Sequence, residues 1–177
     1  MAGQGEDGRR GDLLAPICAH LLAHGLDRSG LRELAAAAGT SDRMLLYYFR
    51  DKADLMAAAM ERLAAGLTAQ LDAARAPAPL SEAALADRLV GMVLDDGVWP
   101  FMQLWLEIAA KGARGDPIFR ETGGRIGAGF LDWIAAQSDA PTEARRRAVA
   151  ARLLPVLDGL ILLKAVGLHE TCAAPWH

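Results

Sequence analysis

The sequence predicts an all-α protein, in which three N-terminal helices are joined by a long fourth helix to a larger helical body. Of the 177 residues, 53% are apolar, and alanine and leucine, which favour helices, make up much of this fraction. Runs that alternate β-branched or aromatic residues with polar ones, the pattern of a strand, are hard to find. Residues that start and stop helices recur along the chain at helical distances.

Four helices are expected in the first 75 residues. Their expected limits are about 13–24, 31–38, 42–48 and 52–75. Asp12 and Asp51 are suitable N-caps for the two longer helices, and Ser41 for the third. Gly25 follows the first helix, where a glycine commonly ends a helix. Residues 1–11 are polar and glycine-rich and lack the apolar segment of a signal peptide, so we expect them to form a disordered arm.

A proline-interrupted connection, APAPL at residues 76–80, separates these helices from the rest of the chain. Four further helices are expected after it. Their expected limits are about 81–95, 101–113, 117–137 and 142–168. The domain boundary itself is expected near the start of the long fourth helix, with an N-terminal domain over residues 12–56 and a C-terminal domain over residues 57–177.

The composition excludes several classes of site. Cys18 and Cys172 are far apart and form no CxxC motif, so neither a disulfide framework nor a zinc site is expected. The most apolar run, residues 153–168, is too short to cross a bilayer, so no membrane partner is expected and the reducing cytoplasm is the expected compartment. The formal net charge is −3, and residues 1–56 hold seven Lys or Arg and eight Asp or Glu. Any argument for DNA binding must therefore rest on geometry.

The two short helices have the spacing of a helix-turn-helix, in which the second helix crosses the first at a steep angle. This crossing needs a small residue in the first helix, a glycine with positive φ at the turn, and an apolar residue inside the second helix. Ala35, Gly39 and Leu45 meet these three demands in register. The alternative is a helical hairpin without a special function.

Helical periodicity gives the helix at 42–48 two different faces. Leu45 and Phe49 are expected to point inward, with Tyr48 half in the core. Arg43, Met44 and Tyr47 are expected to point outward. In a major groove, Arg43 suits guanine, Met44 suits a thymine methyl group, and Tyr47 suits a phosphate or a base edge. Lys52, which starts the next helix, suits a phosphate.

The segment LRELAAAAGTSDRMLLYYFRDKADL, residues 31–55, resembles the DNA-binding signature of the TetR family of bacterial transcriptional regulators. The resemblance implies a homodimer that reads a near-palindromic operator in double-stranded DNA. Arg43 replaces the usual glycine, Leu46 replaces a tyrosine that contacts phosphate, and Gly30 replaces the usual threonine cap. Tyr47 is the expected substitute for the tyrosine, and Arg28 or Ser29 for the threonine. The residues expected at the DNA are Arg28, Ser29, Thr40, Ser41, Arg43, Met44, Tyr47, Tyr48 and Lys52.

The resemblance also implies that the C-terminal body holds a cavity for an effector and forms the dimer interface. An apolar small molecule is the expected effector, because large aromatic and methionine side chains cluster in two of the helices. The candidate residues are Phe101, Met102, Trp105 and Trp133. An aromatic stripe at this spacing is also typical of an ordinary core. The last helix is apolar nearly all round, which favours coverage by a second copy of the chain.

Two features leave alternatives open. Residues 122–130, TGGRIGAGF, hold four glycines, so either a helix breaks there or another backbone approaches closely. His20 and His24 have metal-capable spacing but no evident third ligand, so no metal site is expected. No catalytic residues and no cofactor are expected, because no nucleophile–base pair, phosphate-binding glycine loop or carboxylate pair occurs. The alternative functions are a small-molecule-binding protein and an orphan regulator without a ligand.

Overall fold

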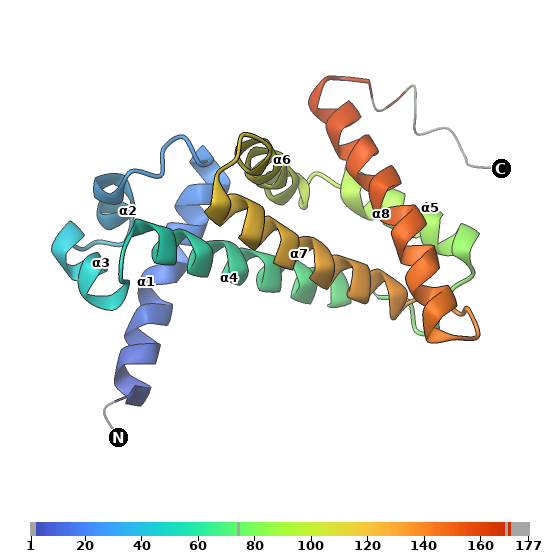
Figure 1. Ribbon diagram of the computed structural model, residues 1–177, viewed down its shortest axis with the longest axis horizontal. Coiled ribbons are helices and arrows are strands. Elements are labelled where there is room, and N and C mark those ends of the chain that lie inside the picture. Colours follow the sequence, from blue (N-terminus) through green and yellow to red (C-terminus); the bar gives the residue numbers. More distant parts are fainter. Residues whose placement is uncertain (1–2, 74, 169, 171–177) are drawn as a thin grey trace. The chain divides into compact units, whose positions relative to one another are not determined.

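The computed structural model describes residues 3–73, 75–168 and 170, and these residues form eight helices (Figure 1). The helices are α1 (Gly3–His24), α2 (Leu31–Ala37), α3 (Asp42–Tyr48), α4 (Lys52–Ala73), α5 (Glu82–Leu94), α6 (Trp99–Ala113), α7 (Pro117–Ala135) and α8 (Glu143–Ala165). Within the described residues, the β-type pairing is limited to an isolated bridge between Leu80 and Ser138. The predicted all-α class is confirmed.

The chain divides into two compact units. The first unit comprises Met1–Gly66 and Leu104–Gly123, and the second comprises Leu67–Gln103 and Gly124–His177. These units do not follow the expected domains 12–56 and 57–177, because residues 104–123 pack with the N-terminal helices.

The first unit is built on α1 and the N-terminal half of α4. The Cys18 thiol of α1 lies 3.5 Å from the Ala59 carbonyl oxygen of α4, so these two helices lie in direct contact. Their apolar faces and those of α2 and α3 form a common core. Its fully buried members include Ile17, Leu21, Leu34, Leu45, Phe49, Leu55 and Met60.

Helix α1 begins at Gly3 rather than near residue 13, so residues 3–11 of the expected arm are helical. A reason lies in Arg10, whose guanidinium contacts Asp54 and lies over the Phe49 ring. These contacts tie this part of α1 to the unit, whereas a disordered arm needs a segment without such partners. Residues 1 and 2 lie outside the described residues.

The glycine-rich segment does not break its helix, because α7 runs continuously from Pro117 to Ala135. Close packing explains one of its glycines. A Cβ atom on Gly123 would lie 3.1 Å from Cγ2 of Ile108 in α6. Gly124, by contrast, faces open space. Of the two alternatives, close approach of a neighbouring helix is therefore the one that holds at Gly123.

The second unit is a bundle of α5, α8 and the C-terminal part of α7, in which α5 packs along α8. Its core is apolar and continuous. The core residues are Leu85, Leu89, Ile134, Ala135, Val149, Ala150, Leu153 and Leu157. The loops before α5 and after α7 pair through their backbones, since the Leu80 N–H donates to the Gln137 carbonyl oxygen at 2.8 Å.

Candidate nucleic-acid interface

Helices α2 and α3 form the helix-turn-helix expected from the sequence. Gly39 has a φ of 62°, which L side chains rarely adopt, and the chain reverses there. The Thr40 N–H donates to the Ala35 carbonyl oxygen at 2.9 Å and closes the turn. Ala35 and Leu45 are buried, as the crossing requires. The three steric roles predicted for Ala35, Gly39 and Leu45 are thus met.

Helix α3 is short and depends on its ends for stability. The Ser41 hydroxyl accepts a hydrogen bond from the Met44 N–H at 3.3 Å, which caps the helix as predicted. Leu45 is the buried residue of α3, and Phe49, directly after it, is also buried. Two buried side chains and a cap therefore hold a seven-residue helix that would not be stable alone.

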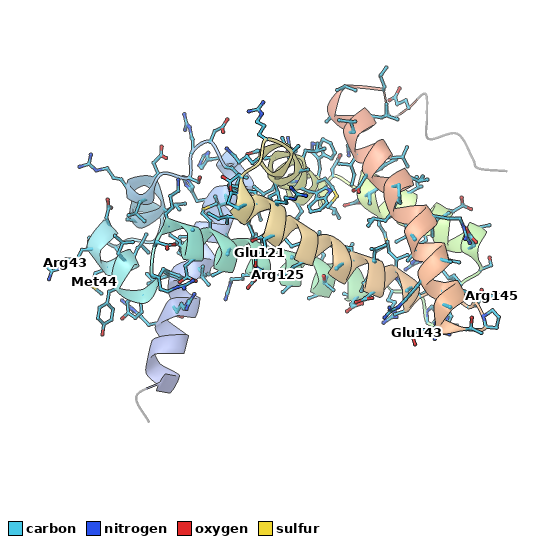
Figure 2. All side chains as sticks on the ribbon, viewed as in Figure 1. Arg43, Met44, Glu121, Arg125, Glu143 and Arg145 are labelled. Atoms are coloured by element: carbon cyan, nitrogen blue, oxygen red, sulfur yellow. The ribbon has the colours of Figure 1, made fainter. Side chains whose placement is uncertain are left out.

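The outward face of α3 carries one charged and three largely apolar side chains. Arg43 and Met44 point away from the ribbon in Figure 2. Met44, Leu46 and Tyr47 are 42%, 46% and 68% exposed. Tyr48 is half-buried, and its ring meets the Tyr47 ring edge to face at 5.0 Å between centroids. The orientations predicted for Tyr47 and Tyr48 agree with the structure.

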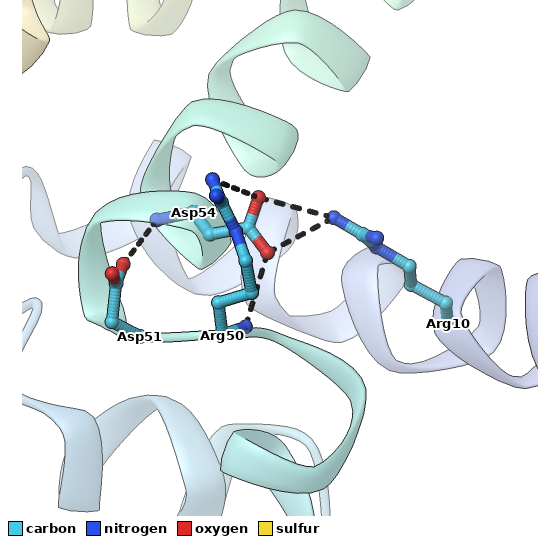
Figure 3. Close-up of polar contacts among 4 residues, drawn as sticks. All are labelled: Arg10, Arg50, Asp51 and Asp54. Carbon is cyan, nitrogen blue, oxygen red and sulfur yellow. Dashed lines mark hydrogen bonds and ion pairs between the residues drawn. The ribbon is translucent and has the colours of Figure 1, made fainter.

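At the connection from α3 to α4, the Asp54 carboxylate accepts hydrogen bonds from two other parts of the first unit (Figure 3). Arg10 from α1 donates to it at 3.4 Å, and the Arg50 backbone N–H donates at 3.1 Å. The Asp51 carboxylate in turn accepts from the Asp54 N–H at 2.8 Å, as expected of an N-cap. The end of α3 and the start of α4 are thereby held in one position relative to α1. Lys52, the first residue of α4, is exposed beside this connection.

The turn between α1 and α2 corrects one predicted DNA contact. Ser29 is buried, and its hydroxyl donates to the Leu26 carbonyl oxygen at 2.5 Å. This side chain is committed to the turn, so it does not substitute for the threonine cap. Gly30 has no side chain to cap α2; the Glu33 carboxylate accepts the Gly30 N–H at 3.0 Å instead. Arg28 is exposed, and Thr40 is half-buried.

The same turn is attached to α6 by a hydrogen bond and an ion pair that sequence reasoning did not find. The Glu107 carboxylate accepts a hydrogen bond from the Leu26 N–H at 2.6 Å, and Lys111 lies 3.5 Å from Asp27. Gly25, with a φ of 71°, also borders Glu107, and a Cβ atom there would collide with the carboxylate. Residues 81 positions apart meet at Glu107, and local pattern carries no signal for such a contact.

The predicted effector residues do not belong to one unit. Trp105 lies in the first unit, whereas Phe101, Met102 and Trp133 lie in the second. Met102 is buried, and the three aromatic residues are half-buried. The Trp133 indole N–H donates to the Asp72 carboxylate at 2.6 Å, so its polar atom already has a partner within the protein.

The described residues contain no group of three His, Cys, Asp or Glu side chains arranged to hold a metal ion. The His20 and His24 rings lie 4.6 Å apart between centroids at an interplanar angle of 56°, and His20 Nε2 donates to the Arg28 carbonyl oxygen. Burial raises the pKa of the Cys18 thiol to about 11, although nearby Arg62 acts in the opposite direction, so this thiol is protonated at neutral pH. Cys172 lies outside the described residues. Among the described helices, none is both long and apolar enough to span a membrane.

Comparison with known proteins agrees with this geometry. The model of the tetR family of bacterial regulatory proteins matches residues 18–59. Over 97 residues the chain is 34% identical to the HTH-type transcriptional repressor AcnR of Corynebacterium glutamicum, a match that covers 55% of this chain and 46% of AcnR. The matched segment thus spans about half the length of that relative.

Two solved structures share the fold. One is a Rhodococcus sp. protein assigned to the TetR-family transcriptional regulators, with a TM-score of 0.66, 20% identity and coverage of 90% of this chain and 88% of that one. The other is a transcriptional regulator from Rhodococcus sp. Rha1, with a TM-score of 0.67, 23% identity and coverage of 89% and 83%.

Proposed function

We propose that this protein is a sequence-specific DNA-binding transcriptional regulator that acts as a repressor. The match of residues 18–59 to the model of the tetR family of bacterial regulatory proteins supports this proposal. The observation that carries this proposal is the exposed face of α3 on a helix-turn-helix whose turn, cap and core are complete. A capped second helix with an outward arginine has the geometry that enters a major groove.

The proposed contacts divide into base-reading and positioning groups. Arg43 and Met44, at the centre of the exposed face, read base edges, and Arg43 suits guanine O6 and N7. The positioning contacts go to phosphates and fix the register of the protein on the duplex. The proposed phosphate-contacting residues are Arg28, Thr40, Ser41, Tyr47, Tyr48 and Lys52.

We propose that the protein acts as a homodimer through α8. Leu162 and Val166 at the end of this helix, and Leu168 just after it, are more than half exposed. A second copy that covers these side chains would present two α3 helices to successive major grooves about 34–36 Å apart, on a near-palindromic operator.

We propose further that an apolar small molecule releases the protein from DNA. The second unit offers the buried, flexible Met102 next to the half-buried Phe101 for such a ligand. Release requires that the effector bind one conformational state better than the other. A panel of apolar compounds tested by thermal melting would detect binding as a rise in melting temperature. The rise should disappear in Met102→Ala, and a panel without any rise would favour an orphan regulator.

DNA binding is tested by fluorescence anisotropy with the purified protein and the intergenic DNA upstream of its own gene, against scrambled DNA of equal length. We expect selective binding that Arg43→Ala weakens by about fivefold or more, since it removes a base contact worth about 1–3 kcal/mol. Tyr47→Ala should also weaken binding, because it removes a proposed phosphate contact. Arg145→Ala is the matched control, because Arg145 is an exposed arginine of α8 outside the helix-turn-helix. Equal affinity for both DNAs, or an equal loss in the control, would contradict the proposal.

A further inference from the structure

Helix α3 leaves an unusual amount of apolar surface in solvent. Six large hydrophobic side chains are exposed among the residues that the structure describes, and three of them, Met44, Leu46 and Tyr47, lie on this one seven-residue helix. Clustered exposed apolar side chains mark interaction surfaces more often than scattered ones do. This cluster therefore calls for a partner with apolar groups at matching positions.

The helical repeat arranges these side chains around Arg43. With 3.6 residues per turn, Tyr47 lies almost directly below Arg43 on the same face. Met44 and Leu46 lie on opposite sides of that line, about 100° and 60° away. A group bound by Arg43 therefore has the apolar side chain of Met44 on one side and that of Leu46 on the other.

The side chains of α3 also limit how the helix can recognise an A·T base pair. In the major groove, adenine is read by Asn or Gln, and thymine exposes its C5 methyl group to apolar contact. Helix α3 has the sequence DRMLLYY and contains neither Asn nor Gln. Its means of distinguishing an A·T pair is therefore apolar contact with the methyl group.

We propose that Met44 and Leu46 are specificity-determining residues that read thymine C5-methyl groups on either side of a guanine bound by Arg43. This inference rests on the proposed function and adds the base chemistry of the operator. It goes beyond the Met44 contact expected from the sequence, because the exposure of Leu46 gives the face a second apolar edge.

The charges next to α3 favour DNA over a protein as the occupant. Arg32 on α2 is exposed, and Arg50 and Lys52 are exposed directly after α3. Of the acidic side chains nearby, Glu33 and Asp51 accept backbone N–H groups and Asp54 pairs with Arg50, while Asp42 in the first turn of α3 is exposed. Basic side chains before and after the apolar strip in the chain suit a major groove, which has phosphates along both edges and thymine methyl groups on its floor.

The test removes single methyl groups from the DNA. Duplexes are first enriched from a random-sequence library with the full-length protein, and each thymine of the enriched site is then replaced by deoxyuridine, which lacks only the methyl group. We expect replacement at one or two positions of each half-site to weaken binding about fourfold per methyl group.

Protein variants then identify the side chain that reads each methyl group. Leu46→Ala or Met44→Ala should weaken binding to the thymine duplex. In each variant, deoxyuridine at the position that the lost side chain contacted should cause no further loss of affinity. Tyr47→Phe is the control on the same face, and it should keep the full deoxyuridine loss because it removes only a hydroxyl group. All three residues are exposed, so the melting temperatures should stay within a few degrees of the wild type.

The outcomes separate this inference from the proposed function. Selective binding with no deoxyuridine effect, or with an effect that persists in both Leu46→Ala and Met44→Ala, would overturn the methyl-reading role and leave the regulator intact. Failure to enrich any sequence would overturn both.

Discussion

The two units of the molecule differ in the interactions that stabilise each of them internally. In the first unit, α2 buries two side chains and α3 one, and their positions depend on glycines with positive φ and on carboxylates that bind backbone N–H groups. In the second unit, α8 alone buries six side chains, four of which belong to the continuous apolar core. Helix α3 is thus positioned by a few groups with demanding geometry, whereas the second unit depends on packed volume.

Four carboxylates illustrate this difference between the two units. Asp54 and Glu107 in the first unit accept hydrogen bonds from the backbone at the ends of helices. Glu82 and Asp96 in the second unit contact the side chains of Arg152 and Lys164. A bond to the backbone fixes the path of the chain, while an exposed pair of side chains adds little to stability. Substitutions in the two units should therefore differ in kind.

The largest effect is expected from Leu85→Ala in the second unit. Leu85 is fully buried in the core of α5, α7 and α8, and its truncation should lower the free energy of unfolding by about 2–5 kcal/mol. Urea denaturation measures this loss. Leu85→Met keeps the volume and should cost less than about 1.5 kcal/mol. Equal losses for the two variants would contradict a core that depends on volume.

Gly25→Ala should have the next largest effect, through geometry and not volume. The positive φ alone should cost about 1–2 kcal/mol, and the new Cβ atom would also meet the Glu107 carboxylate. Gly124→Ala is the control of opposite sign, since Gly124 faces open space within α7 and alanine favours a helix by about 1 kcal/mol. Thermal unfolding of both variants checks the prediction, which would be wrong if both shifted in the same direction.

Arg10→Ala should cost about 0.5–1 kcal/mol, because it removes a partly exposed ion pair with Asp54 and a cation–π contact with Phe49. It should also raise the amide hydrogen exchange rate of Arg50, whose N–H donates to the same carboxylate. Arg9→Ala, at the exposed neighbouring position, should change neither quantity. Equal effects of the two substitutions would show that Arg10 does not hold this connection.

The smallest effect is expected at the surface pair of Glu82 and Arg152. The hydrogen bonds from Arg152 hold the pKa of Glu82 below its ordinary value of 4.5. A carboxyl group with a lowered pKa in the folded state stabilises the fold above its unfolded pKa, and this contribution disappears as the pH falls through the folded value. The difference in unfolding free energy between the wild type and Glu82→Gln should thus be small at pH 7 and smaller still near pH 3. A difference that grows on acidification would contradict the assignment.

Sequence reasoning succeeded for α3 and its turn because their determinants are local. The limits 42–48, the Ser41 cap and the inward side of Leu45 all follow from residues within one or two turns of each other. It failed for Ser29, which was expected at the DNA but is buried, with its hydroxyl donating to the Leu26 carbonyl oxygen in the turn. It also placed Trp133 among the effector residues and did not foresee that the Trp133 indole N–H donates to Asp72, a residue 61 positions away.

By itself, the sequence determined the all-α class, the order of the helices and the outward face of α3, because caps, glycines and helical periodicity act over a few residues. Tertiary structure decided that residues 3–11 join α1, that Glu107 binds the turn after α1, and that Ser29 is buried. Each of these outcomes depends on partners that only folding brings within hydrogen-bond distance, and residue spacing along the chain does not encode which polar groups will meet.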